Sequence, residues 1–147
     1  MSDAPIYALL PFNPADGWEI EFSDLAGAQP ASVSSADLTR LDAALTTAVA
    51  RLNERYEQAN AAWWDAHPDS SYNRAFLLID LPRYVRQYLA CRTPAGAVLV
   101  LVKLLLHPRP DWRTQVRWVL DGGNAHVDAL YEPALNKLHW LRPHGSA

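Results

Sequence analysis

Residues 34–66 read SSADLTRLDAALTTAVARLNERYEQANAAWWDA and carry the longest regular pattern in the chain. Apolar residues recur there at intervals of three, four and, at the end, seven, which places them in one stripe of an α-helix. Ser34 followed three residues later by Asp37 resembles a capping box. The pattern predicts one long amphipathic helix over about residues 35–65, ending before Pro68. The stripe consists of Leu38, Leu41, Leu45, Val49, Leu52, Tyr56 and Trp63.

After residue 80 the apolar residues recur with period 2, the period of a β-strand. The nearly continuous apolar run over residues 97–107, AVLVLVKLLLH, is rich in β-branched residues and predicts a central strand. Hairpin connections in series predict an antiparallel meander of about four to five strands. One long helix packed on this meander makes a two-layer α+β fold. The predicted strands span residues 85–93, 97–107, 115–121, 124–132 and 137–142, with a tight turn at Gly122-Gly123.

The N-terminal part contains two short apolar segments, residues 6–10 and 18–22, separated by proline and glycine. The second alternates apolar and polar residues and predicts a short strand, whereas residues 26–35 read as a loop. A chain of this length buries roughly two-thirds of the surface that it exposes when unfolded, enough for an independent core. We therefore expect one α+β domain over residues 1–147. Its parts are the N-terminal strands and loop (1–33), the long helix (34–66) and the meander (81–142).

Half of the residues are apolar and a fifth are charged, which is the composition of a globular protein. The single cysteine, Cys91, excludes an internal disulfide and a multi-cysteine zinc site. The first residues lack a signal-peptide pattern, and no apolar run reaches the about 20 residues that span a bilayer. These features predict a cytoplasmic protein without a membrane anchor. Residues 1–80 have a charge balance of −8 and residues 81–147 one of +5, so the basic half either neutralises the acidic half or faces an acidic partner.

The pairing of the first two meander strands decides which side chains face the helix. If Arg92 and Ala97 flank the turn, then Cys91, Leu89 and Gln87 face the helix, and the cysteine is a small buried apolar residue rather than a nucleophile. The outer face then has an apolar centre rimmed by cations, which suits contact with a protein partner or self-association. Alternatively, the N-terminal segment or the tryptophans at the end of the helix cover this face. The outer-face residues are Arg86, Tyr88, Leu99, Leu101, Lys103 and Arg117.

Three residues near the C-terminus suggest a metal or acid–base site. His126 and Asp128 project from the same side of one predicted strand, and His139 lies diagonal to Asp128 on the next. Two histidines and a carboxylate can bind a divalent metal, and a His–Asp pair can transfer protons. Alternation on an exposed hairpin produces the same juxtaposition without any function, and the spacing matches no established motif. We therefore expect no catalytic residue and no cofactor.

Nucleic-acid binding is not expected. RNA-binding sheets present two or three exposed aromatic residues on which bases stack. Only Tyr88 falls on the predicted outer face of the first three strands. The net charge of −3 and the lack of a glycine-rich basic motif point the same way.

The C-terminal part also carries a series of turn and strand motifs. Arg86-Gln87-Tyr88 opens a strand, and Trp112 precedes the third predicted strand. Asp121-Gly122-Gly123 and Tyr131-Glu132-Pro133 follow, and the chain ends in Gly145-Ser146-Ala147. In these motifs the last sixty-odd residues resemble a loosely defined group of small, uncharacterised bacterial α+β proteins. Leu135-Asn136 stands where that group has glycine, and asparagine is the next best residue for a left-handed backbone. The resemblance implies a strand–DGG–strand–turn–strand arrangement and no known activity.

These features lead to two hypotheses about function. The first is a non-enzymatic protein-binding module, for instance an inhibitor or immunity-type partner of another bacterial protein, which uses the outer sheet face. The second is a small-molecule-binding or enzymatic α+β cone that encloses a pocket between helix and sheet. Trp63, Trp118 and Trp140 would line that pocket. A closed core between helix and sheet would count against the second hypothesis.

Overall fold

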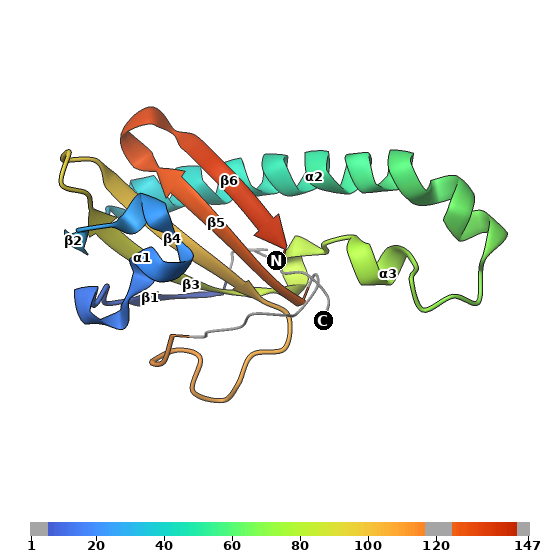
Figure 1. Ribbon diagram of the computed structural model, residues 1–147, viewed down its shortest axis with the longest axis horizontal. Coiled ribbons are helices and arrows are strands. Elements are labelled where there is room, and N and C mark those ends of the chain that lie inside the picture. The colour runs from blue at the N-terminus through green and yellow to red at the C-terminus, as the bar shows by residue number, and fades with distance from the viewer. Residues whose placement is uncertain (1–5, 117–124, 144–147) are drawn as a thin grey trace.

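The computed structural model describes residues 6–116 and 125–143, and it places one long helix across one face of a β-sheet (Figure 1). The sheet order is β1-β3-β4-β5-β6, and β2 pairs with β3. Strand β1 is parallel to β3, while every other described pairing is antiparallel. The fold is therefore the predicted two-layer α+β type, with a mixed sheet. The strands are β1 (Tyr7–Leu10), β2 (Gln29–Pro30), β3 (Val85–Arg92), β4 (Val98–Leu105), β5 (His126–Glu132) and β6 (Lys137–Pro143).

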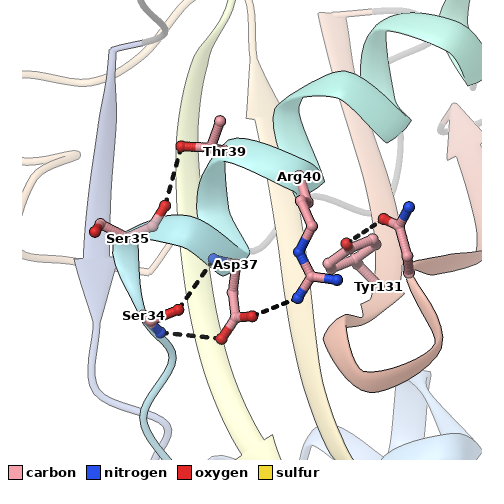
Figure 2. Close-up of polar contacts among 7 residues, drawn as sticks. Ser34, Ser35, Asp37, Thr39, Arg40 and Tyr131 are labelled. Carbon is pink, nitrogen blue, oxygen red and sulfur yellow. Dashed lines mark hydrogen bonds and ion pairs between the residues drawn. The ribbon is translucent and has the colours of Figure 1, made fainter.

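Helix α2 (Ser35–Ala66) confirms the long predicted helix and its capping box. The backbone N–H of Asp37 donates to Ser34 Oγ at 3.1 Å, and the N–H of Ser34 donates to Asp37 Oδ2 at 3.1 Å (Figure 2). Arg40 then pairs with the same carboxylate at 2.7 Å. The backbone hydrogen bond, followed by the Arg40 contact, lowers the pKa of Asp37. The box is therefore intact at neutral pH, and its contribution is lost as the pH falls through that lowered pKa.

The first half of α2 supplies the main core. Leu38, Leu41, Leu45 and Val49 are buried against the helix-facing side of the sheet. Their sheet partners are Tyr88 on β3, the residues Val100, Val102 and Leu104 on β4, and Val127, Ala129 and Tyr131 on β5. The interior between helix and sheet is thus filled by side chains.

The second half of α2 extends past the sheet and packs on residues 67–84, which include α3 (Arg74–Leu77) (Figure 1). Arg74 bridges Glu57 at 2.7 Å and Asp65 at 3.2 Å. Because this half has a different packing partner, its buried face rotates. Trp64 is buried here, whereas Trp63, which the predicted stripe placed inside, is 43% exposed.

The N-terminal segment was predicted to contain a strand over residues 18–22, and this prediction is wrong. These residues form the short helix α1 (Trp18–Glu21), which begins after Gly17 in a left-handed conformation (φ 72°). Trp18, Phe22 and Leu25 are buried, at helical intervals of four and three. Ile20, which a strand would have buried beside Trp18, is 89% exposed. Residues four apart share a face in both a strand and a helix, so the buried pair Trp18 and Phe22 fits either pattern, and the exposed Ile20 with the buried Leu25 fits the helical one.

The predicted register of β3 and β4 is wrong by one residue, because Arg92 pairs with Val98 and not with Ala97. Thr93 N–H donates to Ala97 O at 2.9 Å and Gly96 N–H to Thr93 O at 2.8 Å, and Gly96 has φ 93°. The loop is thus one residue longer than predicted. A slip of one residue turns every side chain of β3 to the other face. Gln87, Leu89 and Cys91 therefore face away from α2, while Arg86 and Tyr88 face it.

The third predicted strand does not occupy its expected place in the sheet. Strand β4 pairs directly with β5, with Leu105 opposite His126. Gln115 and Val116 lie outside any strand, and residues 117–124, with the predicted Gly122-Gly123 turn, lie outside the described residues. The remaining strand predictions are confirmed to within one or two residues. The β5–β6 turn places Asn136 at φ 46°, the left-handed position expected for it.

No helix among the described residues is both long and apolar enough to cross a membrane.

Replacing the capping serine, Ser34→Ala, should lower the free energy of unfolding by about 1 kcal/mol, because one N–H at the start of α2 loses its acceptor. Urea denaturation followed by circular dichroism measures the change. Ser32→Ala, an exposed serine just before the cap, is the matched control and should change stability by less than about 0.5 kcal/mol. Equal effects of the two substitutions would contradict the capping role.

Candidate functional site

The outer sheet face, which the sequence predicted as a protein-contact surface, is covered by the chain itself. Residues 10–28 lie over it and bury Trp18, Phe22 and Leu25 against Leu99 and Leu101. Lys103, on the same face, is also fully buried. These three β4 residues therefore cannot touch a partner, and the alternative, a cover by the N-terminal segment, is the correct one. Arg117 lies outside the described residues.

The other two predicted contact residues are buried on the opposite face, as the register slip requires. Arg86 Nη1 donates to Asp42 Oδ1 of α2 at 2.7 Å and to the hydroxyl of Tyr88 at 3.1 Å. The ring of Tyr88 stacks on Tyr7, with centroids 5.1 Å apart. Both residues hold α2 and β1 to the sheet and form no exposed surface.

A buried polar cluster lies beneath the N-terminal segment. Lys103 Nζ is 3.2 Å from Asp128 Oδ1, and His126 Nε2 is 3.3 Å from the same oxygen. The Lys103 ammonium also lies over the rings of Trp18 and Phe22, at 5.7 and 5.8 Å. All five side chains are buried, so no substrate reaches this cluster from solvent. Its evident role is to neutralise a cation within the core.

Gln87, beside this cluster, anchors the segment that follows β4. Its Nε2 donates to the carbonyls of Trp112 and Gln115 at 2.7 and 2.6 Å. A fully buried amide that bonds two loop carbonyls fixes the path of residues 112–115.

The three residues considered as a metal site are not brought together. His126 and Asp128 are neighbours in the buried cluster, but His139 Nε2 contacts Glu132 Oε1 at 2.9 Å on the exposed hairpin. A bulge between Leu130 and Tyr131 shifts the register of β5 and β6, so that Trp140 and not His139 faces Leu130. Within residues 6–116 and 125–143 no group of three histidine, cysteine or acidic side chains could hold a metal ion.

The structure does not bring Trp63 and Trp140 of the predicted tryptophan pocket together, and only Trp140 lines the groove between helix and sheet described below. Trp63 stacks on His67 near the end of α2, with centroids 4.1 Å apart. Trp140 stacks on Phe22, and its indole N–H donates to Asp24 Oδ2 at 3.0 Å, on the N-terminal side of the sheet. Trp118 lies outside the described residues.

A different site lies between α2 and the end of the sheet, in an open groove of about 880 Å³. Its helix wall runs from Arg40 to Arg55, and the middle of that wall is made of small residues. These are Ala43, Ala44, Thr47 and Ala48. The opposite wall is residues 135–141, the β5–β6 turn and most of β6. The small helix residues leave room beside the strand.

The positive and negative side chains of α2 lie on different sides of the helix with respect to this groove. The helix contains three arginines, Arg40, Arg51 and Arg55, and all three line it. None of the five carboxylates of the helix is among the lining residues. Within the described part of the chain, no ion pair involves Arg51, Arg55 or Lys137, which also lines the groove. The groove is therefore basic in an acidic protein.

The strand wall exposes backbone as well as side chains. Side chains of a strand alternate between its faces, so a wall that contacts one face includes only every second residue. Here all five consecutive strand residues 137–141 line the groove, together with residues 135 and 136 of the turn. Strand β6 also ends the described sheet. The groove thus runs along the open edge of β6, where N–H and C=O groups point away from β5.

Sequence reasoning missed this groove, although one signal was present. Arg40, Arg51 and Arg55 are spaced by 11 and 4 residues, which puts them on one side of a helix. The wall contributed by β6 comes from a segment about eighty residues later in the chain, and no local pattern links the two.

No protein-family model, curated protein or solved structure matches this chain. The similarity of its C-terminal motifs to small bacterial α+β proteins therefore stays a prediction.

The Cys91 thiol should be unreactive in the folded protein. The side chain is buried against Leu89 and Leu99, and burial raises its pKa to about 11. At pH 8 only roughly one thiol in a thousand is then ionised, and the reagent cannot reach it. Ellman's reagent should react at least 100-fold faster in denaturant than in buffer. Comparable rates in the two conditions would contradict burial of Cys91.

Removing the shared carboxylate, Asp128→Ala, should lower the free energy of unfolding by about 3–5 kcal/mol, because Lys103 and His126 lose their common partner in the core. The double variant Lys103→Met/Asp128→Leu should recover most of that loss. Urea denaturation of Lys103→Met, Asp128→Leu and their double variant gives the coupling energy. Additive losses would show that the two side chains do not interact.

Proposed function

We propose that the chain is a non-enzymatic protein-binding module, of the inhibitor or immunity type, whose contact surface is the groove between α2 and β6. The observation that carries this proposal is the sorting of charge on α2, with every arginine on the groove and every carboxylate off it. The proposal keeps the function expected from the sequence and moves its surface away from the covered sheet face.

The arrangement of Arg51 and Arg55 supports a binding role over a structural one. They stand four residues apart on one helix face, where like charges destabilise a helix by about 0.2–0.5 kcal/mol. Neither has an ion-pair partner among the described residues. Such a pair adds nothing to the stability of the fold, whereas a partner with acidic side chains neutralises both cations.

The length of the groove favours a protein segment over a compact small molecule. The helix wall from Arg40 to Arg55 covers about 22 Å at 1.5 Å per residue, and the strand residues 137–141 opposite it cover about 13 Å at 3.3 Å per residue. A trough of this length suits a chain of about four to seven extended residues. The alternative cone with an enclosed pocket loses support because the helix–sheet interior is filled.

We also propose a cytoplasmic location, since the one thiol is buried and unpaired.

Selection of random peptides displayed on phage tests this function. The folded wild type should enrich peptides rich in aspartate and glutamate. Synthetic versions of these peptides should bind the charge-reversed variant Arg51→Glu/Arg55→Glu at least tenfold more weakly, because attraction becomes repulsion across the groove. Fluorescence polarisation measures the affinities, and circular dichroism confirms that both proteins are folded.

The matched control is Arg83→Glu/Arg109→Glu, which changes the net charge equally at two exposed arginines outside the groove. It should bind the selected peptides within about threefold of wild type. Peptides without an acidic bias, or equal weakening by both double variants, would refute the groove as the contact surface.

A further inference from the structure

Resting on the proposed function, we infer that the partner contributes an extended acidic segment that adds to the sheet as a strand beside β6. The occupant is therefore one stretch of backbone in β conformation, with its acidic side chains directed at α2. This mode of recognition draws affinity from main-chain hydrogen bonds and specificity from alternate side chains.

The edge of β6 provides the main-chain half of this recognition. Its neighbour on one side is β5, and the groove lies along the other side, where five consecutive residues of β6, 137–141, line it. Sheet edges in stable proteins are commonly protected by inward-pointing charges, by a bulge or by a covering element. The bulge of β6 lies at His139, between the pairs Leu130–Trp140 and Tyr131–Leu138, on the side that faces β5. The groove, rather than a covering element of the described chain, borders the outer edge.

The helix wall provides the side-chain half. An added strand places every second side chain toward α2. At one end these side chains meet Arg51 and Arg55, whose guanidinium groups can hold carboxylates through paired hydrogen bonds. In the middle they meet Ala44, Thr47 and Ala48, whose small side chains leave room for the added strand.

The other end of the trough is closed by a rigid turn. Arg40 lies there, and its guanidinium is held by Asp37 of the capping box (Figure 2). The hydroxyl of Tyr131 donates to the side chain of Asn136, the residue with φ 46°, and so fixes the turn between β5 and β6. Because Arg40 is already partly neutralised, the strongest attraction for an acidic side chain lies at the Arg51–Arg55 end.

The probe is a fluorescein-labelled octapeptide of alternating glutamate and valine, with the lysine–valine octapeptide as the charge control. Two further versions carry N-methyl groups, one on every glutamate nitrogen and the other on every valine nitrogen. Successive N–H groups of a strand point to opposite edges, so only one of the two versions blocks the edge that meets β6. Wild type should bind the parent peptide at least tenfold more tightly than one methylated version and within threefold of the other.

Amide hydrogen exchange on the protein gives an independent measurement. The parent peptide should slow the exchange of alternate amides within residues 137–141, since those N–H groups gain acceptors on the added strand. The exchange of amides in β4, which are already paired on both sides, should not change.

The outcomes separate the inference from the proposed function. Loss of binding in Arg51→Glu/Arg55→Glu, without a difference between the two methylated peptides and without protection in β6, would overturn strand addition and leave the acidic contact surface intact. Failure of the glutamate–valine peptide, when display-selected acidic peptides bind, would also overturn strand addition alone. A single-stranded oligothymidylate that binds the groove more tightly than any acidic peptide would overturn both in favour of nucleic acid.

Discussion

Strand β4 is apolar on both of its faces and paired along both of its edges, and the arrangement of the other elements follows from this constraint. Val100, Val102 and Leu104 need one cover, which α2 provides. Leu99 and Leu101 need another, which the N-terminal segment provides. Lys103 is the only charged residue of the strand, and its burial requires a carboxylate across the sheet, at Asp128 on β5. Both faces of β4 are thus covered by other parts of the chain, and a surface for a partner has to lie elsewhere.

The elements that sequence reasoning placed correctly are those specified by local pattern. Helix α2 has both a capping box and an apolar stripe of helical period, and β4 has an apolar run that only a doubly covered strand tolerates. The register between β3 and β4 depended instead on the conformation of Gly96 and on a single hydrogen bond between Thr93 and Ala97. No periodicity records these features, and an error of one residue exchanged the two faces of β3.

The contact face was mispredicted for a different reason. An apolar patch rimmed by cations has the composition of an interface, and it has the same composition when another part of the chain covers it. Trp18, Phe22 and Leu25 carried the information that a cover existed, but their alternation with acidic residues resembled a strand. The spacing of Arg40, Arg51 and Arg55 indicated the helix wall of the groove. The strand wall required the β5–β6 hairpin to be placed beside the helix.

The end of α2 beyond the sheet has its own set of supports. The side-chain amide of Asn53 donates to the carbonyl of Ile79 and accepts from its N–H, both at 2.8 Å. Arg74 forms exposed ion pairs with Glu57 and Asp65. Ile79, Leu81 and Tyr84 belong to the core cluster that contains Val102 and Leu104, so the end of this region next to β3 is tied to the sheet. Within residues 57–77 only Trp64 is buried, so we expect this outer part to open at a lower free energy than the sheet. Arg51 and Arg55 lie between this outer part of α2 and the part that packs on the sheet, so the groove borders both.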